Sequence, residues 1–300
     1  RKVCINLRMI DSILMMFCSK VNNTLKSKCF IDMKKIFYIP LTLAICFQVG
    51  VNYAQDAANK TVQAGLTFNA GANFLSPGTT KITSEDVGSL LSIGVAIHSS
   101  FKSSENLGIA TGLDFDFGKN SYSPTSITYL DYIEGEVLTQ ENSANALGTM
   151  RLEQRALSTI KLTVPVMLLF RTGFIGDFRY FGKFGLRNSF LLSQKFTDTG
   201  TDIFGFEDVT NELMSSPGEF FVYNGSVGLS AGAEWNFVGS TCLVLEAGYY
   251  YGITPYFLNR KEENKTMYNI DSILISPPSR TYYSASGRQN QLVFKLSVLF

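Results

Sequence analysis

Alternation of apolar and polar residues runs through most of the chain after residue 60, and it constrains the fold more than any other feature. In the segment TVQAGLTFNAGANFL, apolar residues occupy every second position from Val62 to Phe74, with Thr, Gln, Gly and Asn between them. A period of two places successive side chains on opposite faces of a β-strand. Seven further segments share the pattern, at residues 90–101, 107–118, 158–171, 180–196, 225–237, 241–253 and 291–300. The sequence therefore predicts an all-β protein with eight strands.

The connections between these segments alternate between short and long. Short ones are KSSEN, TGFIGD and VGS, whereas the long ones cover residues 76–88, 119–156, 196–221 and 255–289. Transmembrane β-barrels combine tight turns at the periplasmic end with long loops at the extracellular end. Each segment is also long enough for a tilted strand of about 9–11 residues to cross a bilayer. We expect an eight-stranded antiparallel transmembrane β-barrel in the bacterial outer membrane, with short periplasmic turns, long extracellular loops and both chain ends at the periplasmic side.

A secreted β-sandwich is the alternative, because its strands alternate too. Two features favour the barrel. The apolar face of each segment continues over five to seven positions, and the opposite face holds Gly, Ser, Asn, Thr and charges of both signs. Only 17% of the residues are charged, compared with about 25% in an average soluble domain. An apolar face toward lipid and an enclosed polar face explain both observations.

The segment that begins at Met33 has the composition of a secretory signal peptide. Lys34 and Lys35 precede an apolar run that ends near Val51, and Ala54 is a plausible cleavage position. The run is short for a membrane anchor, and Ile45 precedes Cys46 where a lipoprotein needs a small residue. We expect residues 1–32 to be a spurious upstream extension, residues 33–54 a signal peptide and residues 55–300 the barrel domain. Cys242 is then the one cysteine of the mature chain, so no internal disulfide is expected.

The final strand alternates as regularly as the others and ends on an aromatic residue. A soluble edge strand with such a bare apolar face would invite aggregation. We interpret this strand as the part of the barrel that the outer-membrane insertion machinery recognises. The expected assembly signal consists of Leu292, Phe294, Leu296, Val298 and Phe300.

Five stretches of the sequence resemble the PorT-like family of outer-membrane β-barrel proteins. They are AQDAANKTVQAGLTFNAGANF, STIKLTVPVMLLF with Pro165 inside a strand, YFGKFGLRNSFLLSQK, LVLEAGYYYGIT and QLVFKLSVLF. The resemblance covers residues 60–300 and is one of strand texture. It implies an eight-stranded barrel in a family whose members mostly lack an assigned function, with a founding member tied to a type IX secretion pathway.

Charged residues on the predicted inner face form a nearly balanced set. In a barrel of eight strands the interior is just wide enough for side chains to fill, and buried charges persist when they are paired. We expect a salt-bridged interior that closes the barrel, with a continuous pore as the alternative. The expected lumen network consists of Asp114, Asp116, Lys161, Lys183, Arg187, Glu234, Glu246 and Lys295, with Arg171 as a further inward cation.

Catalysis has weak support in the sequence. His98 is the single histidine, and it shares the predicted inner face with Asp114 and Asp116, so it could act as a general base. A hydrogen-bonded lumen residue is the simpler interpretation, because no serine or cysteine nucleophile motif accompanies it. The sequence shows no metal-ligand spacing and no phosphate-binding loop. We therefore expect a protein without catalytic activity, cofactor or metal.

The remaining expectations concern surfaces. Aromatic residues near strand ends should lie at the boundary between lipid and water, with loop contacts as the alternative for some of them. These residues are Tyr180, Phe181, Trp235, Phe237, Tyr249, Tyr250, Tyr251 and Tyr256. The polar loops could bind an extracellular ligand or an envelope protein, or they could be variable surface without one ligand. Other expected partners are outer-membrane lipid and the barrel-assembly machinery. A net charge of +1 gives no indication of nucleic acid. The sequence thus predicts a structural or binding scaffold, with a PorT-like role in secretion or envelope assembly as the alternative.

Overall fold

The computed structural model describes residues 61–131, 149–214, 219–238, 241–258, 265–272 and 279–300. Every described residue belongs to one compact unit, Asp56–Phe300. The expected upstream extension and signal peptide lie outside the described residues. Within the described residues, no helix is long and apolar enough to cross a membrane.

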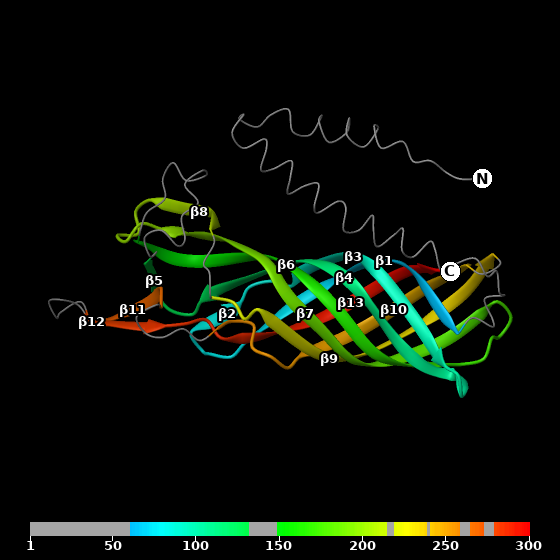
Figure 1. Ribbon diagram of the computed structural model, residues 1–300. Helices are drawn as coiled ribbons and strands as arrows, with labels where there is room; N and C mark the ends of the chain where they lie inside the picture. The colour runs from blue at the N-terminus through cyan, green and yellow to red at the C-terminus, as the bar shows by residue number, and fades with distance from the viewer. Residues whose placement is uncertain (1–60, 132–148, 215–218, 239–240, 259–264, 273–278) are drawn as a thin grey trace, which may run out of the picture. The chain divides into compact units, whose positions relative to one another are not determined.

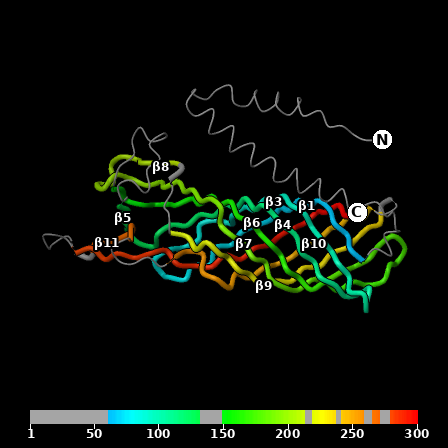
Figure 2. Tube along the Cα trace, viewed as in Figure 1, coloured from blue at the N-terminus to red at the C-terminus, as the bar shows by residue number. Residues whose placement is uncertain are grey.

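Eight long strands form a closed antiparallel ring (Figure 1). Each strand pairs with the next in the order β1, β3, β4, β6, β7, β9, β10, β13, and β13 pairs again with β1. The strands cross the wall of the ring at a common tilt, as Figure 2 shows. This confirms the eight-stranded barrel. The strands are β1 (Val62–Pro77), β3 (Gly88–Phe101), β4 (Ser104–Pro124), β6 (Thr149–Arg171), β7 (Phe178–Thr201), β9 (Tyr223–Val238), β10 (Thr241–Gly252) and β13 (Gly287–Leu299).

The ring closes where the first strand meets the last. The pairing of β1 with β13 runs from Gly65 opposite Leu299 to Pro77 opposite Gly287. The two backbones approach so closely that a Cβ atom on Gly65 would overlap the carbonyl oxygen of Val298. Phe300 donates its backbone N–H to the carbonyl of Ala64 at 2.9 Å, so hydrogen bonding continues to the last residue.

The outer face of the ring is apolar, as the alternation predicts. On β13 and directly after it the side chains of Phe294, Leu296, Val298 and Phe300 are exposed, whereas Ser297 and Leu299 between them are buried. The same pattern holds on every strand of the ring. Exposed outer residues include Leu66, Phe68, Leu91, Ile93, Ile109, Phe115, Phe117, Val166, Leu168, Phe170, Phe184, Leu186, Leu229, Leu245 and Tyr249.

Parts of the long connections fold, although the sequence analysis expected loops there. Strand β4 continues to Pro124, β6 already begins at Thr149, and β7 continues to Thr201. Together with four of the added strands, β6 and β7 form a sheet in the order β12, β11, β5, β6, β7, β8 beyond one end of the ring (Figure 1). We call it the outer sheet. The added strands are β2 (Ile82–Ser84), β5 (Thr128–Asp131), β8 (Asp208–Met214), β11 (Met267–Ser272) and β12 (Ser279–Tyr283).

The polarity of the two faces reverses where the ring continues into the outer sheet. On β7 a β-bulge produces the reversal: Lys161 pairs with Leu191 and Ile160 with Ser193, so Leu192 has no partner across the ladder. One extra residue turns every later side chain to the opposite face. Before the bulge Lys183, Arg187 and Ser189 are buried, whereas after it Phe196 is buried and Lys195 is exposed.

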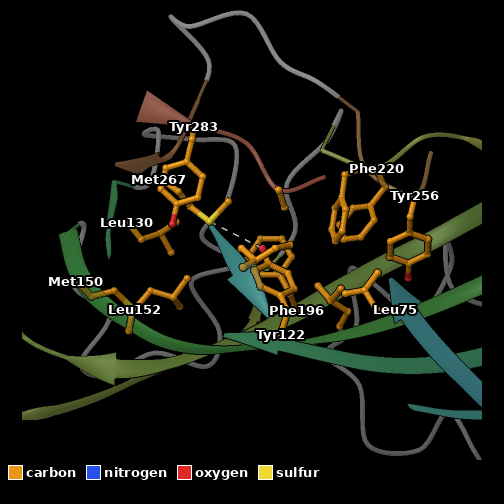
Figure 3. Close-up of a cluster of buried hydrophobic side chains, with 14 of the residues drawn as sticks. Leu75, Tyr122, Leu130, Met150, Leu152, Phe196, Phe220, Tyr256, Met267 and Tyr283 are labelled. Carbon is orange, nitrogen blue, oxygen red and sulfur yellow. Dashed lines mark hydrogen bonds between the residues drawn. The ribbon is translucent and has the colours of Figure 1, made fainter. Parts of the chain in front are cut away.

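The reversed face gives the outer sheet an apolar core of its own. Side chains from β1, β2, β4 to β8, β11 and β12 meet there with Phe220 and Tyr256 (Figure 3). Tyr122 donates its hydroxyl to the sulfur of Met267 at 3.9 Å, and the ring of Phe220 packs against that of Tyr256 at 5.5 Å. This core explains why the connections fold instead of forming open loops. It comprises Leu75, Ile82, Tyr122, Leu130, Met150, Leu152, Leu157, Phe196, Val209, Phe220, Tyr256, Phe257, Met267, Tyr283 and Ala285.

The aromatic prediction holds for only some of its members. Tyr180, Trp235, Tyr249 and Tyr251 are exposed on the outer face. Phe181 and Tyr250 were assigned wrongly, because they are buried inside the ring. Tyr256 lies outside the strands and is buried in the core of the outer sheet. The side chain of Phe237 lies outside the described residues. Phe181 and Tyr250 belong to a second apolar cluster at the level of the ring, together with Met167, Leu169 and Val293 among others.

Candidate functional site

Ion pairs fill the middle of the barrel and join strands that are far apart in sequence. Arg187 on β7 donates to Asp116 on β4 at 2.7 Å. Lys183, four residues earlier, donates to Glu246 on β10 at 2.5 Å. Lys295 on β13 lies 3.4 Å from Asp114 on β4. The strand register brings these six expected lumen residues together in three pairs across the barrel interior.

Hydroxyl groups satisfy further acceptors of this network. Thr163 donates to the carboxylate of Asp116 at 2.6 Å, and its oxygen lies 2.7 Å from the hydroxyl of Ser189. Ser230 donates to Glu246 at 2.7 Å. Such bonds help to offset the cost of removing a carboxylate from water.

Lys161 lies in a different environment from the other lumen cations. Its ammonium group donates to the amide oxygen of Gln289 at 2.5 Å and lies 4.7 Å from the centre of the Tyr256 ring. Its contacts place it between the ion pairs and the apolar core of the outer sheet.

Glu234 is the centre of a second group near the short-turn end. It accepts from Nε of Arg179 at 2.8 Å and lies 3.1 Å from Nη2 of Arg171. Both arginines also reach the amide oxygen of Gln63. The sequence analysis missed Arg179, because the predicted strand began at Tyr180, one residue later. With Arg179 included, six cations face four carboxylates inside the ring, so the set is less balanced than the sequence indicated.

His98 belongs to this second group and not to the aspartates with which the sequence analysis associated it. Its Nδ1 lies 3.5 Å from Glu234, its Nε2 lies 3.0 Å from Nζ of Lys183, and its ring packs edge-on against Phe181. On β4 it is paired with Ala110, whereas Asp114 and Asp116 pair with Gly94 and Ser92. His98 is 2% exposed. In this position the imidazole is not accessible to a substrate from which it could accept a proton.

The interior has little free volume at the level of the ion pairs. A cavity lined by Asp114, Arg187, Glu246, Tyr250 and Lys295 has a volume of about 10 Å³. That is about the space that a single water molecule requires. In the described part of the barrel, no three His, Cys, Asp or Glu side chains are placed to hold a metal ion. Cys242 is a buried free thiol.

A buried charge cluster inside the outer sheet had no counterpart in the sequence analysis. Arg155 on β6 donates to both carboxylate oxygens of Asp198 on β7, at 2.5 and 2.8 Å, and to Glu219 at 2.8 Å. Its guanidinium also lies 4.2 Å from the centre of the Phe196 ring. All three residues fall in connections that the sequence analysis treated as loops or loop borders. The apolar residues of MRLEQRAL mostly keep the even-numbered phase of the following strand, so alternation along the chain did not indicate this cluster.

The residues of the expected assembly signal lie along the closing strand β13. Four of them face outward, as described above, and Leu292 is half-buried. The strand pairs with β1 on one side and with β10 on the other.

These features define a class of protein: a closed barrel with an apolar outer wall, a filled polar interior and short turns at one end spans a membrane by its strands. The chain belongs to the family described as outer membrane protein beta-barrel domain, whose family model matches residues 53–258, more than half of the chain. It is therefore a bacterial outer-membrane β-barrel protein. No curated protein matches the sequence.

Several solved outer-membrane proteins are similar to this chain. OprG from Pseudomonas aeruginosa has 9% identity and a TM-score of 0.38, and the match covers 79% of this chain and 92% of that one. Neisserial surface protein A has 9% identity and a TM-score of 0.30, covering 80% and 98%. Ail from Yersinia pestis has 8% identity and a TM-score of 0.31, covering 80% and 100%.

Proposed function

We propose that this protein is a closed, non-catalytic scaffold that holds the outer sheet above the outer membrane and binds a partner protein there. The observation that carries the proposal is the continuity of β6 and β7. These two strands run from the barrel wall into the outer sheet, and the outer sheet has its own apolar core. A binding surface on such a sheet is positioned by the barrel, which lowers the entropy lost on binding.

The filled interior supports a scaffold over a pore. Three ion pairs and the Glu234 group fill the interior of the ring, and the core of the outer sheet lies beyond one end of it. Opening a path for ions would require separation of buried charges, which is costly. In planar bilayers the purified protein should therefore give no steady conductance above the lipid background, and a reproducible single-channel conductance would refute the closed barrel.

The absence of catalysis is part of the proposal. His98 is enclosed by Glu234, Lys183 and Phe181, and these contacts explain it as a structural lumen residue. A variant with His98→Ala should retain every activity that membranes containing the protein show toward lipids or peptides.

The remaining proposed partners follow from the outer wall and the closing strand. Outer-membrane lipid would contact the exposed apolar residues of the ring. The barrel-assembly machinery would recognise β13, where Phe294, Leu296, Val298 and Phe300 present an unbroken apolar row.

The second candidate is a PorT-like role in a secretion or envelope assembly system. The resemblance of the strand texture over residues 60–300 favours it. Such a component is expected to form a discrete membrane complex with contacts beyond the outer sheet.

Protease shaving of intact cells distinguishes the two candidates. Cells carrying the tagged protein are crosslinked with formaldehyde before or after an added protease removes the outer sheet, and the barrel is then purified. A scaffold should lose its crosslinked partner after shaving, because the contact is extracellular. A secretion component should keep a discrete complex after shaving. If no partner is crosslinked in either sample, the scaffold proposal fails.

A further inference from the structure

The hairpin that joins β7 to β8 ends in a fixed turn. β7 ends at Thr201 and β8 begins at Asp208. The carboxylate of Asp202 accepts the backbone N–H of Phe206 at 2.7 Å and that of Glu207 at 3.3 Å, and its carbonyl accepts from Gly205 at 3.0 Å. Gly205 has a φ of 77°, a left-handed conformation that a side chain disfavours. Three hydrogen bonds and the left-handed conformation of Gly205 therefore hold the turn in one conformation.

This fixed turn presents three large apolar side chains to solvent. Ile203 is 46% exposed, Phe204 is 72% exposed and Phe206 is 87% exposed. We call these three residues the apolar tip. Exposed apolar residues that are scattered singly need no explanation, but a contiguous group on a rigid support marks an interaction site. Because the Asp202 turn holds the backbone, the tip would lose little conformational freedom on binding.

The membrane of the same cell is too far away to cover the tip. The last exposed apolar residue of the β7 wall is Leu192, and Thr201 lies nine positions further on (201 − 192 = 9). At about 3.3 Å per residue the strand continues for about 30 Å. With a tilt of about 40° the tip stands about 20 Å above the apolar band.

Acidic residues surround the apolar tip. Asp202 lies before it, and Glu207 and Asp208 follow it with exposed side chains. One cation lies against the turn: Nη1 of Arg151 is 3.5 Å from the position that a Cβ atom on Gly205 would take. We call Asp202, Glu207 and Asp208 the acidic collar. Its three carboxylates outnumber the one guanidinium of Arg151, and the resulting negative charge disfavours an anionic lipid surface and attracts a basic partner.

We propose that the apolar tip inserts into an apolar pocket with a Lys- or Arg-rich rim on a partner protein at the cell surface. The inference deepens the proposed scaffold function and rests on it. Aromatic side chains in fully desolvated pockets dominate the binding energy of many interfaces. Phe204 and Phe206 are the anchors in this arrangement, and the acidic collar provides orientation and association rate.

The first experiment identifies the occupant of the tip on intact cells. A photoreactive phenylalanine analogue replaces Phe206 in the full-length protein, and a matched variant carries it at Thr210, which is exposed on β8 of the same hairpin. We expect a discrete protein adduct from position 206 and none from position 210. The adduct by itself does not establish the proposal, so the captured protein is produced separately and its affinity for the purified barrel is measured by biolayer interferometry.

The affinity series tests both parts of the proposal. The variant F204S/F206S should bind at least about 30-fold more weakly, the effect expected of a hot-spot anchor. The variant E207K/D208K should also bind more weakly, and added salt should weaken binding of the unchanged protein. T210S should bind as the unchanged protein does, and heat-modifiable gel mobility establishes that each barrel is folded.

Three results would overturn the inference. The first is equal adducts from positions 206 and 210, or none from 206. The second is an affinity that F204S/F206S leaves unchanged or that E207K/D208K increases. The third is flotation of the protein with phosphatidylcholine vesicles through the tip, which would make the occupant a lipid surface. If shaving removes the partner but F204S/F206S does not, the scaffold function stands and the tip inference alone fails.

Discussion

Replacement of Arg155 by methionine tests whether buried charge pairing holds the outer sheet together. Arg155 is 1% exposed and pairs with Asp198, which is 0% exposed, and with Glu219. Removing one partner of a buried ion pair typically costs about 3–5 kcal/mol, because the remaining charge stays in a medium of low dielectric. Here two carboxylates remain next to each other, so we expect the upper part of that range. At about 1.4 kcal/mol per factor of ten, this is roughly a thousandfold increase in the open population.

Amide hydrogen exchange of the purified protein in detergent micelles measures the population of the open outer sheet, segment by segment. Peptides covering residues 193–201 should lose about three orders of magnitude of protection in R155M, whereas peptides from the ring should change little, because local opening need not unfold the barrel. The control is R280M, which breaks the exposed pair between Arg280 and Asp131 at 3.1 Å. An exposed pair contributes about 0–1 kcal/mol.

The triple variant R155M/D198N/E219Q separates loss of charge pairing from loss of packing. Without charge in the cluster, most of the protection should return, since a neutral cluster of similar volume carries no uncompensated charge. Equal protection in R155M and R280M would refute the reasoning. A triple variant as unprotected as R155M would show that packing against Phe196, and not charge, is decisive.

Three further predictions concern the wall, the turn and the closing strand. Leu245→Arg places a charge on the outer face near the middle of the apolar band and should lower the free energy of unfolding in lipid vesicles by about 2–4 kcal/mol, whereas Ser193→Arg beyond the band should change it by less than about 1 kcal/mol. Desolvation opposes ionisation of Asp202, but the N–H groups of Phe206, Glu207 and Gly205 together hold its pKa below its usual range. The turn should therefore be ordered above the ordinary aspartate pKa and loosen as the pH falls through the lowered value, which NMR of the Phe206 amide would detect; Asp202→Ala should abolish this pH dependence. Deletion of Phe300 should reduce the fraction of heat-modifiable protein in cells but leave refolding from urea into micelles intact, and equal losses in both would contradict a role in assembly.

The ring was predictable because its information is local. A period of two fixes which side chains share a face, and in a membrane the apolar face has only one favourable direction. Leu245 and Phe294 could therefore be placed on the outer wall, and Glu246 and Lys295 inside it, from the sequence. The even number of strands and the alternation of connection lengths then determined the order of the ring.

The outer sheet was not predictable in the same way, because a single residue changes the face of all those that follow it. Without knowing that Leu192 forms a bulge opposite Ile160 and Lys161, the pattern of the ring assigns Phe196 to the wrong face. The short strands β5, β8 and β11 are also too brief to produce a clear period. They form because a shared apolar core stabilises them together.

The sequence by itself determined that this chain forms a barrel, which residues face lipid and which are enclosed, because each of those properties follows from neighbours along one strand. The tertiary structure decided which enclosed charges meet. Arg155, Asp198 and Glu219 come from separate parts of the chain, and His98 contacts Glu234 and Lys183 instead of the aspartates on the adjacent strand. Such pairings depend on the stagger of strands around the closed ring and on its bulges, which composition and alternation along one strand do not encode.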